Sequence, residues 1–111
     1  MTDLAAFLRA RLYEDEQMAL DAIGGQVDIS APTATHLHIL RWSSKRVLAE
    51  VKAKRSIVTD FESWGAAPDR LTNPGTLLHW MALRNVMYAL AEVYQDHPDY
   101  AAVVDAMRNT V

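Results

Sequence analysis

The chain has 111 residues, of which 50% are hydrophobic and 23% are charged, and its formal net charge at pH 7 is −3. This balance argues against disorder and predicts one globular domain over residues 1–111. Because the sequence contains no cysteine, disulfide bonds, thiolate metal sites and a cysteine nucleophile are excluded.

The N-terminal residues MTDLAAF lack the basic, apolar and small-residue segments of a signal peptide. We therefore expect a cytoplasmic protein. No stretch of about eighteen residues is free of charged side chains, as a membrane span would need to be, and the most apolar stretch carries Arg84 and Glu92. We expect no contact with a membrane.

The first predicted element is an amphipathic helix over about residues 3–23, with Thr2 as its N-cap and Gly24 just after its end. Asp15 projects toward the apolar side of this helix. It is either an edge carboxylate in water or a partly buried acid that needs a partner. Because Lys54 projects onto the apolar side of a later helix, an ion pair between Lys54 and Asp15 is one hypothesis.

Residues 26–42 show a different pattern. Val27 and Ile29 alternate with polar residues, Pro32 interrupts the pattern, and alternation resumes over residues 36–40. A small β-hairpin of two short strands and an irregular loop both fit this pattern.

Histidines in this segment offer a candidate metal site. On a strand, His36 and His38 would share one face, and His79 or His97 could supply a third zinc ligand. The HxH pattern arises easily by chance, and His79 fits better as a hydrogen-bonded histidine of the core. We therefore predict no metal site and no cofactor, and keep a metal-dependent enzyme as the third hypothesis.

A second helix is predicted over about residues 45–64, beginning after Ser43 or Ser44 and closed by Gly65. The segment 41–55 has a local charge of +5, which leaves −8 for the rest of the chain. Its cations could contact phosphates while a tryptophan stacks on a base, or they could form a solvated face balanced by the acidic first helix. The residues of this alternative nucleic-acid interface are Arg41, Trp42, Lys45, Lys52 and Arg55.

The most apolar element is a third helix over residues 77–94, with Thr76 as its cap. A helix that is apolar around most of its circumference is packed on several sides by its own chain or by another copy. We therefore expect a homodimer or another protein partner on this helix and the last one. The predicted interface residues are Trp80, Met81, Arg84, Met87, Tyr88 and Tyr100.

A short final helix is predicted from Pro98 to Arg108, because proline is favoured in a first helical turn. The side chain of Asp96 or His97 would cap it. The sequence before this helix is therefore interpreted as a structural motif of Asp96, His97, Pro98 and Asp99.

Three blocks of sequence carry a resemblance to a known family. They are DLAAFLRARLYEDEQ (residues 3–17), RVLAEVKAKRSIV (residues 46–58) and YQDHPDY (residues 94–100). In this order they resemble a family of short uncharacterised proteins of actinobacteria and their phages, a domain of unknown function. Family members often have a Pro-Gly-Pro-Trp turn after the first helix and an insert with cysteine and histidine, and this chain has neither.

The predicted fold is all-α, with three long helices in a bundle and a short C-terminal helix. No HExxH, P-loop, GxGxxG or GxSxG motif occurs, so we predict no catalytic residues and no enzyme. The expected function is that of a small non-enzymatic accessory protein, encoded by a phage or prophage, which binds a host protein or itself.

Overall fold

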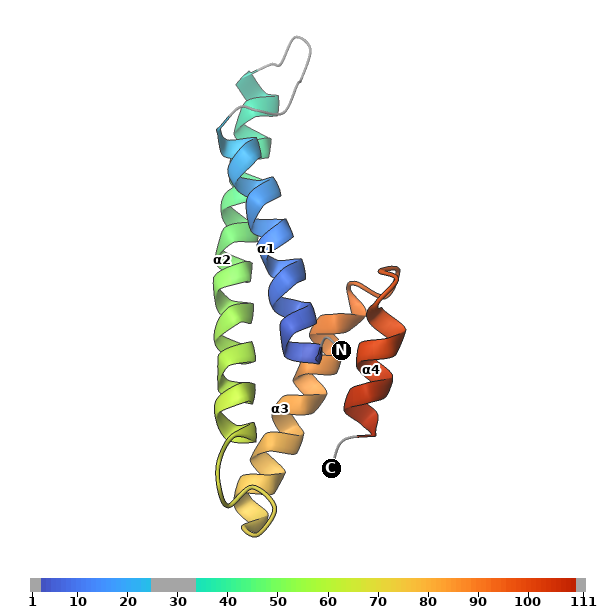
Figure 1. Cartoon of the computed structure of the whole chain (residues 1–111). Helices are drawn as coiled ribbons and strands as arrows, with labels where there is room; N and C mark the ends of the chain where they lie inside the picture. Colours follow the sequence, from blue (N-terminus) through green and yellow to red (C-terminus); the bar gives the residue numbers. More distant parts are fainter. Residues whose placement is uncertain (1–2, 25–33, 110–111) are drawn as a thin grey trace.

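The computed structural model describes residues 3–24 and 34–109 of the chain, with the backbone alone over residues 34–41. All regular secondary structure in these ranges is helical, which confirms the all-α prediction (Figure 1). Three long helices are followed by one short helix, as predicted. Their bounds are α1 Leu4–Ile23, α2 Ala34–Gly65, α3 Pro74–Glu92 and α4 Tyr100–Arg108.

The strand predicted over residues 36–40 is wrong, because α2 already begins at Ala34. A short alternation of apolar and polar residues fits a strand and a half-buried helix equally well. No glycine or proline interrupts the sequence between Ala34 and Gly65, so a helix that has formed there continues at little cost. Residues 26–33, which include the rest of the predicted hairpin, lie outside the described ranges.

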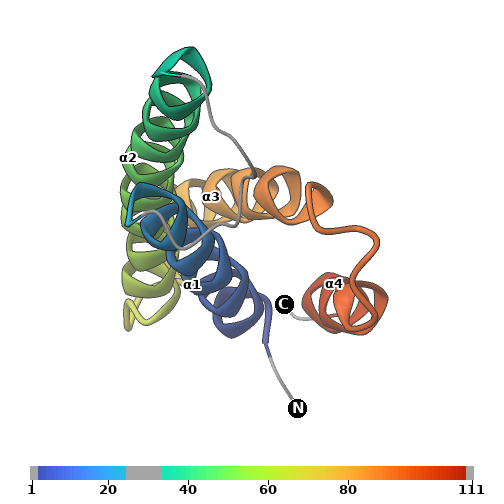
Figure 2. The same cartoon turned by 90° about the horizontal axis from the view of Figure 1, so that it is seen from above.

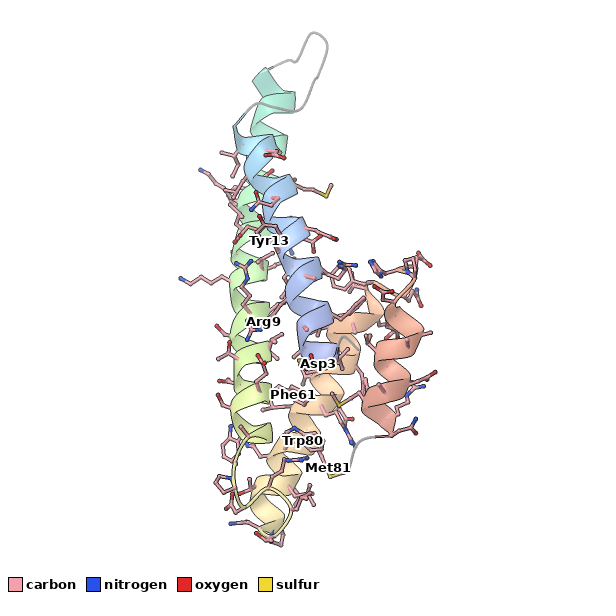
Figure 3. All side chains as sticks on the ribbon, in the orientation of Figure 1. Asp3, Arg9, Tyr13, Phe61, Trp80 and Met81 are labelled. Atoms are coloured by element: carbon pink, nitrogen blue, oxygen red, sulfur yellow. The ribbon has the colours of Figure 1, made fainter. Side chains whose placement is uncertain are left out.

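The first helix packs antiparallel to α2 along a stripe of aliphatic side chains. Its N-cap is Asp3, whose carboxylate accepts a hydrogen bond from the Ala6 backbone N–H at 2.7 Å. The predicted cap, Thr2, lies outside the described residues. Ion pairs tie the two helices together on one side, where Arg9 reaches Glu62; Figure 3 shows the Arg9 side chain on α1 beside α2.

The third helix begins at Pro74, about one turn before the start that the predicted N-cap Thr76 implied. Asn73 is the N-cap, and its side-chain oxygen accepts hydrogen bonds from the backbone N–H groups of Gly75 and Thr76 at 2.9 and 3.4 Å. Pro74 occupies the first helical turn, where its missing N–H costs nothing. Thr76 instead donates its hydroxyl to Asp69 at 3.2 Å.

The core lies where all four helices meet. Phe61 of α2 and Trp80 of α3 stack there, with ring centroids 5.8 Å apart (Figure 3). Gly65 ends α2 against the same indole, and a Cβ at this position would lie 2.9 Å from Trp80 Nε1. The largest fully buried side chains of the core are Leu4, Leu8, Leu12, Val58 and Met87.

The helices differ greatly in length, and this gives the molecule its shape. The 32 residues of α2 extend about 48 Å, whereas the 19 residues of α3 extend about 28 Å. The third helix leans against one end of α2, and α4 lies beside α1 and α3 (Figures 1 and 2). The other end of the α1–α2 hairpin projects beyond α3, and neither α3 nor α4 lies against it.

The resulting molecule is elongated, with extents of 61 × 26 × 17 Å. Its radius of gyration is 17.5 Å, against about 13 Å for a compact domain of this length.

No helix in the described part of the chain combines the length and apolarity that crossing a bilayer requires.

Candidate functional site

An open groove lies between α1 and α2 where α3 ends, and we call it the hairpin groove. Its volume is ≈ 420 Å³, within the size range of binding pockets. Three segments of the chain supply its lining. They are Asp15, Met18 and Ala19 of α1, Ser43, Ser44, Val47, Glu50, Val51 and Lys54 of α2, and Val93 and Tyr94 after α3.

The groove has an apolar floor and an apolar lip. Ala19 and Val51 are buried beneath it, and Val47 is half-buried. Met18 lies on α1, and Val93 lies at the C-terminal end of α3. Both line the groove, and each has 71% of its surface exposed. Exposed apolar side chains gathered around a depression are typical of binding surfaces, and methionine adapts its shape to many partners.

A hydrogen bond closes the end of the groove next to α3. The Tyr94 hydroxyl donates to Asp15 Oδ2 at 2.6 Å. Burial, and then this hydrogen bond, raise the pKa of Tyr94 well above its ordinary value, so the hydroxyl remains a donor at neutral pH. Asp15 is therefore the partly buried acid that the sequence allowed, but its partner is Tyr94, and the proposed Lys54–Asp15 ion pair is not among those of the described residues.

The α2 edge of the groove carries charges of both signs. Glu50 and Lys54 both line it, one turn apart on the same helix. Glu50 also accepts a hydrogen bond from Arg46 Nε at 3.3 Å, in an exposed pair of the kind that contributes little to stability. Because charges of both signs lie along this edge, it would not repel a partner of either net charge.

The predicted basic row faces the other side of the α1–α2 hairpin. Arg55 binds the Glu16 carboxylate through two hydrogen bonds of 2.6 and 3.3 Å. These bonds lower the pKa of Glu16 and raise the pKa of Arg55, so the acidic first helix neutralises one cation of the row. Lys52 lines a second, more polar groove of ≈ 600 Å³ beside this pair.

The remaining part of the row lies toward the projecting end of α2. Trp42 is 66% exposed, and with Lys45 and Arg46 it lines a small depression of ≈ 290 Å³. The side chain of Arg41 lies outside the described part of the chain. The structure therefore separates Trp42 and Lys45 from the Arg55–Glu16 pair.

The predicted interface on α3 is not one surface. Trp80 and Met87 are buried, with 4% and 0% of their surface exposed, so they cannot contact a partner of the folded chain. Arg84 covers the Trp80 ring at 5.1 Å from its centroid. Tyr88 and Tyr100 are half-buried against the core, and Met81 is 37% exposed.

Sequence reasoning missed the groove because its residues come from three separated segments. The helical pattern cannot say which side of α3 its neighbours cover, and here they cover the side of Trp80 and Met87. Met18 could have indicated the groove, because it is an apolar residue outside the apolar stripe of its own helix. Val93 gave no such indication, because it was indistinguishable from the other apolar residues of α3.

The DHPDY sequence is a structural turn between α3 and α4. The Asp99 backbone N–H donates to His97 Nδ1 at 3.0 Å, and the imidazole packs edge-on against Phe7 with ring centroids 5.3 Å apart. The prediction that Asp96 or His97 caps α4 is wrong, because Asp99 occupies the N-cap position and its side chain makes no capping hydrogen bond. The helix begins at Tyr100 and not at Pro98. Asp96 is exposed in this turn.

Metal-ligating side chains do not cluster in the described ranges, where no group of three or more could hold an ion. His36 and His38 belong to the residues for which only the backbone is described, so the candidate zinc ligands are not tested. His79 is exposed and stacks on Trp64, with ring centroids 4.0 Å apart, so its assignment to the core is wrong.

The chain belongs to a family of unknown function (DUF6221), whose model matches residues 1–103. Neither a search of curated proteins nor a search of solved structures found a match.

Proposed function

We propose that this protein is a small non-enzymatic accessory protein that acts by binding another protein in the hairpin groove. One observation carries the proposal: α3 stops partway along the α1–α2 hairpin and leaves an apolar groove open, with Met18 and Val93 exposed at its lip. An apolar surface of this kind is stabilised by a partner that removes it from water.

The shape of the groove favours an α-helix as the bound element. Two antiparallel helices form its walls, and α3 already packs against the same pair further along (Figure 1). A helix laid along the α1–α2 pair beyond the end of α3 would extend this packing, with its apolar side facing Val47 and Met18. Amphipathic helices bind many proteins in this way.

We also propose that the protein is encoded by a phage or prophage and acts in the cytoplasm of an actinobacterial host. The support is the resemblance of the blocks at residues 3–17, 46–58 and 94–100 to short proteins of that origin. The partner would then be a host protein or another copy of the chain.

Nucleic-acid binding is the second candidate function. The exposed Trp42 beside Lys45 favours it, because an aromatic ring next to a cation can stack on a base near a phosphate. The Arg55–Glu16 pair opposes it by neutralising part of the row. With Lys45 and Lys52 as the contacting cations, log K for a single strand would change with log salt with a slope of about −1.4.

The proposed function is tested by affinity capture with three tagged proteins: the wild type, Met18→Glu/Val93→Glu and Leu78→Glu. Leu78 is a matched control, because it is 66% exposed and does not line the groove. Each is incubated in a host lysate supplemented with the untagged chain, with and without nuclease.

Capture of a protein by the wild type and the Leu78 control, but not by the groove variant, supports the proposal. Equal capture by all three refutes it. Capture that is lost only after nuclease treatment identifies the nucleic-acid function instead.

A further inference from the structure

We infer that the occupant of the hairpin groove is a second copy of this chain. The inference rests on the proposed function of the groove as a protein-binding site. It adds the identity of the partner and predicts a dimer in which the hairpin grooves of two copies face each other.

The first argument is the amount of exposed surface. The chain exposes 7447 Å², whereas a folded monomer of this mass exposes about 6,100 Å². The excess is about 1,300 Å², and each partner in a stable complex of standard size buries about 800 Å². A second copy of standard interface size would therefore remove more than half of this excess.

The second argument is the architecture of the groove. Its α1 and α2 walls form a pair of antiparallel helices, and no other helix of residues 3–24 and 34–109 covers the groove between them. Two such pairs placed face to face make a four-helix bundle, in which each pair buries the apolar side of the other. Small residues in the lining, Ala19, Ser43 and Ser44, leave room for a close approach.

The third argument is charge. In a symmetric dimer the same surface patch contacts itself, so a patch of one sign would repel its copy. Here Asp15, Glu50 and Lys54 line the groove, and Arg46 pairs with Glu50 at its α2 edge. Because two cations offset the two carboxylates, a second copy meets a surface of balanced charge.

Sedimentation equilibrium of the untagged full chain tests the inference directly. We expect a monomer–dimer equilibrium for the wild type. Met18→Glu should raise the dissociation constant about 100-fold, because each copy contributes one buried methionine and the loss counts twice. Leu78→Glu should leave it unchanged, and circular dichroism should show the same helix content in all three proteins.

A distance measurement locates the interface without a disruptive substitution. Because the chain has no cysteine, Asp21→Cys and Leu78→Cys each offer one site for a nitroxide spin label. Asp21 is exposed one turn from Met18 and does not line the groove, so its label should give a short, sharp distance between copies by pulsed electron spin resonance. The label at position 78, on α3 away from the groove, should give a longer one.

A wild-type chain that remains monomeric at its highest soluble concentration overturns the inference. So does a dimer that Met18→Glu leaves intact, because its interface then lies elsewhere. The proposed function is judged separately, since groove-dependent capture of a host protein by a monomeric chain would leave that proposal standing while refuting the second copy.

Discussion

The hydrogen bond between Tyr94 and Asp15 should stabilise the fold measurably, because it joins α1 to the end of α3 across the chain. Its length is 2.6 Å, and both partners are partly buried. A hydrogen bond to a charged acceptor contributes about 1.5–3 kcal/mol, and partial access to water places this one near the lower limit, at about 1.5 kcal/mol. For a domain of this size the corresponding decrease in Tm is about 6 °C.

A double-mutant cycle isolates this contribution. Urea unfolding of the wild type, Tyr94→Phe, Asp15→Ala and the double variant gives the coupling free energy between the two side chains. We expect a coupling of about 1.5 kcal/mol, with most of the effect already present in Tyr94→Phe. A coupling below about 0.3 kcal/mol, the value typical of independent sites, would refute the assignment of this bond as a tie between α1 and α3.

Three further predictions follow from burial, capping and titration. Met87→Ala should lower the free energy of unfolding by about 2–5 kcal/mol because Met87 is fully buried, whereas the same change at the exposed Met81 should cost far less; similar losses would contradict the packing of α3. Asn73→Ala should cost about 1 kcal/mol through loss of the N-cap of α3, with Asn85→Ala, on the exposed side of that helix, as the control in urea unfolding. The raised pKa of Tyr94 in the folded state means that its contribution is complete below pH 10, the ordinary pKa of tyrosine, and is lost as pH rises above it. The wild type should therefore lose stability between pH 10 and 11 more steeply than Tyr94→Phe, by at most about 1.4 kcal/mol per pH unit, and parallel curves would contradict this.

The helices were largely predictable because local signals define them. An apolar stripe followed by glycine placed α1, and the glycine at position 65 placed the end of α2. The start of α2 was not predictable, since alternation over residues 36–40 suits either structure and Pro32 suggested an interruption. The helix over these residues continues from the rest of α2, where no glycine or proline interrupts it.

The candidate site was much less predictable than the fold. A projection of α3 shows that Trp80, Met87 and Val93 are apolar, but the neighbours in space decide that Trp80 and Met87 are buried and Val93 is exposed. The partner of Asp15 was missed for the same reason. Lys54 was selected by charge, whereas the fold brings the hydroxyl of Tyr94 to the carboxylate.

The contacts of Phe7 connect the two ends of the chain and have a consequence for the order of folding. Its ring packs against Tyr94 and His97, residues that a ribosome adds long after α1 and α2 are complete. The α1–α2 hairpin joins two helices that follow each other in the sequence and can form early, while the contacts of Phe7 with residues 94 and 97 must close a longer loop. A nascent chain that has not yet reached Tyr94 therefore exposes the Phe7 ring on α1, and the segment between α3 and α4 covers it.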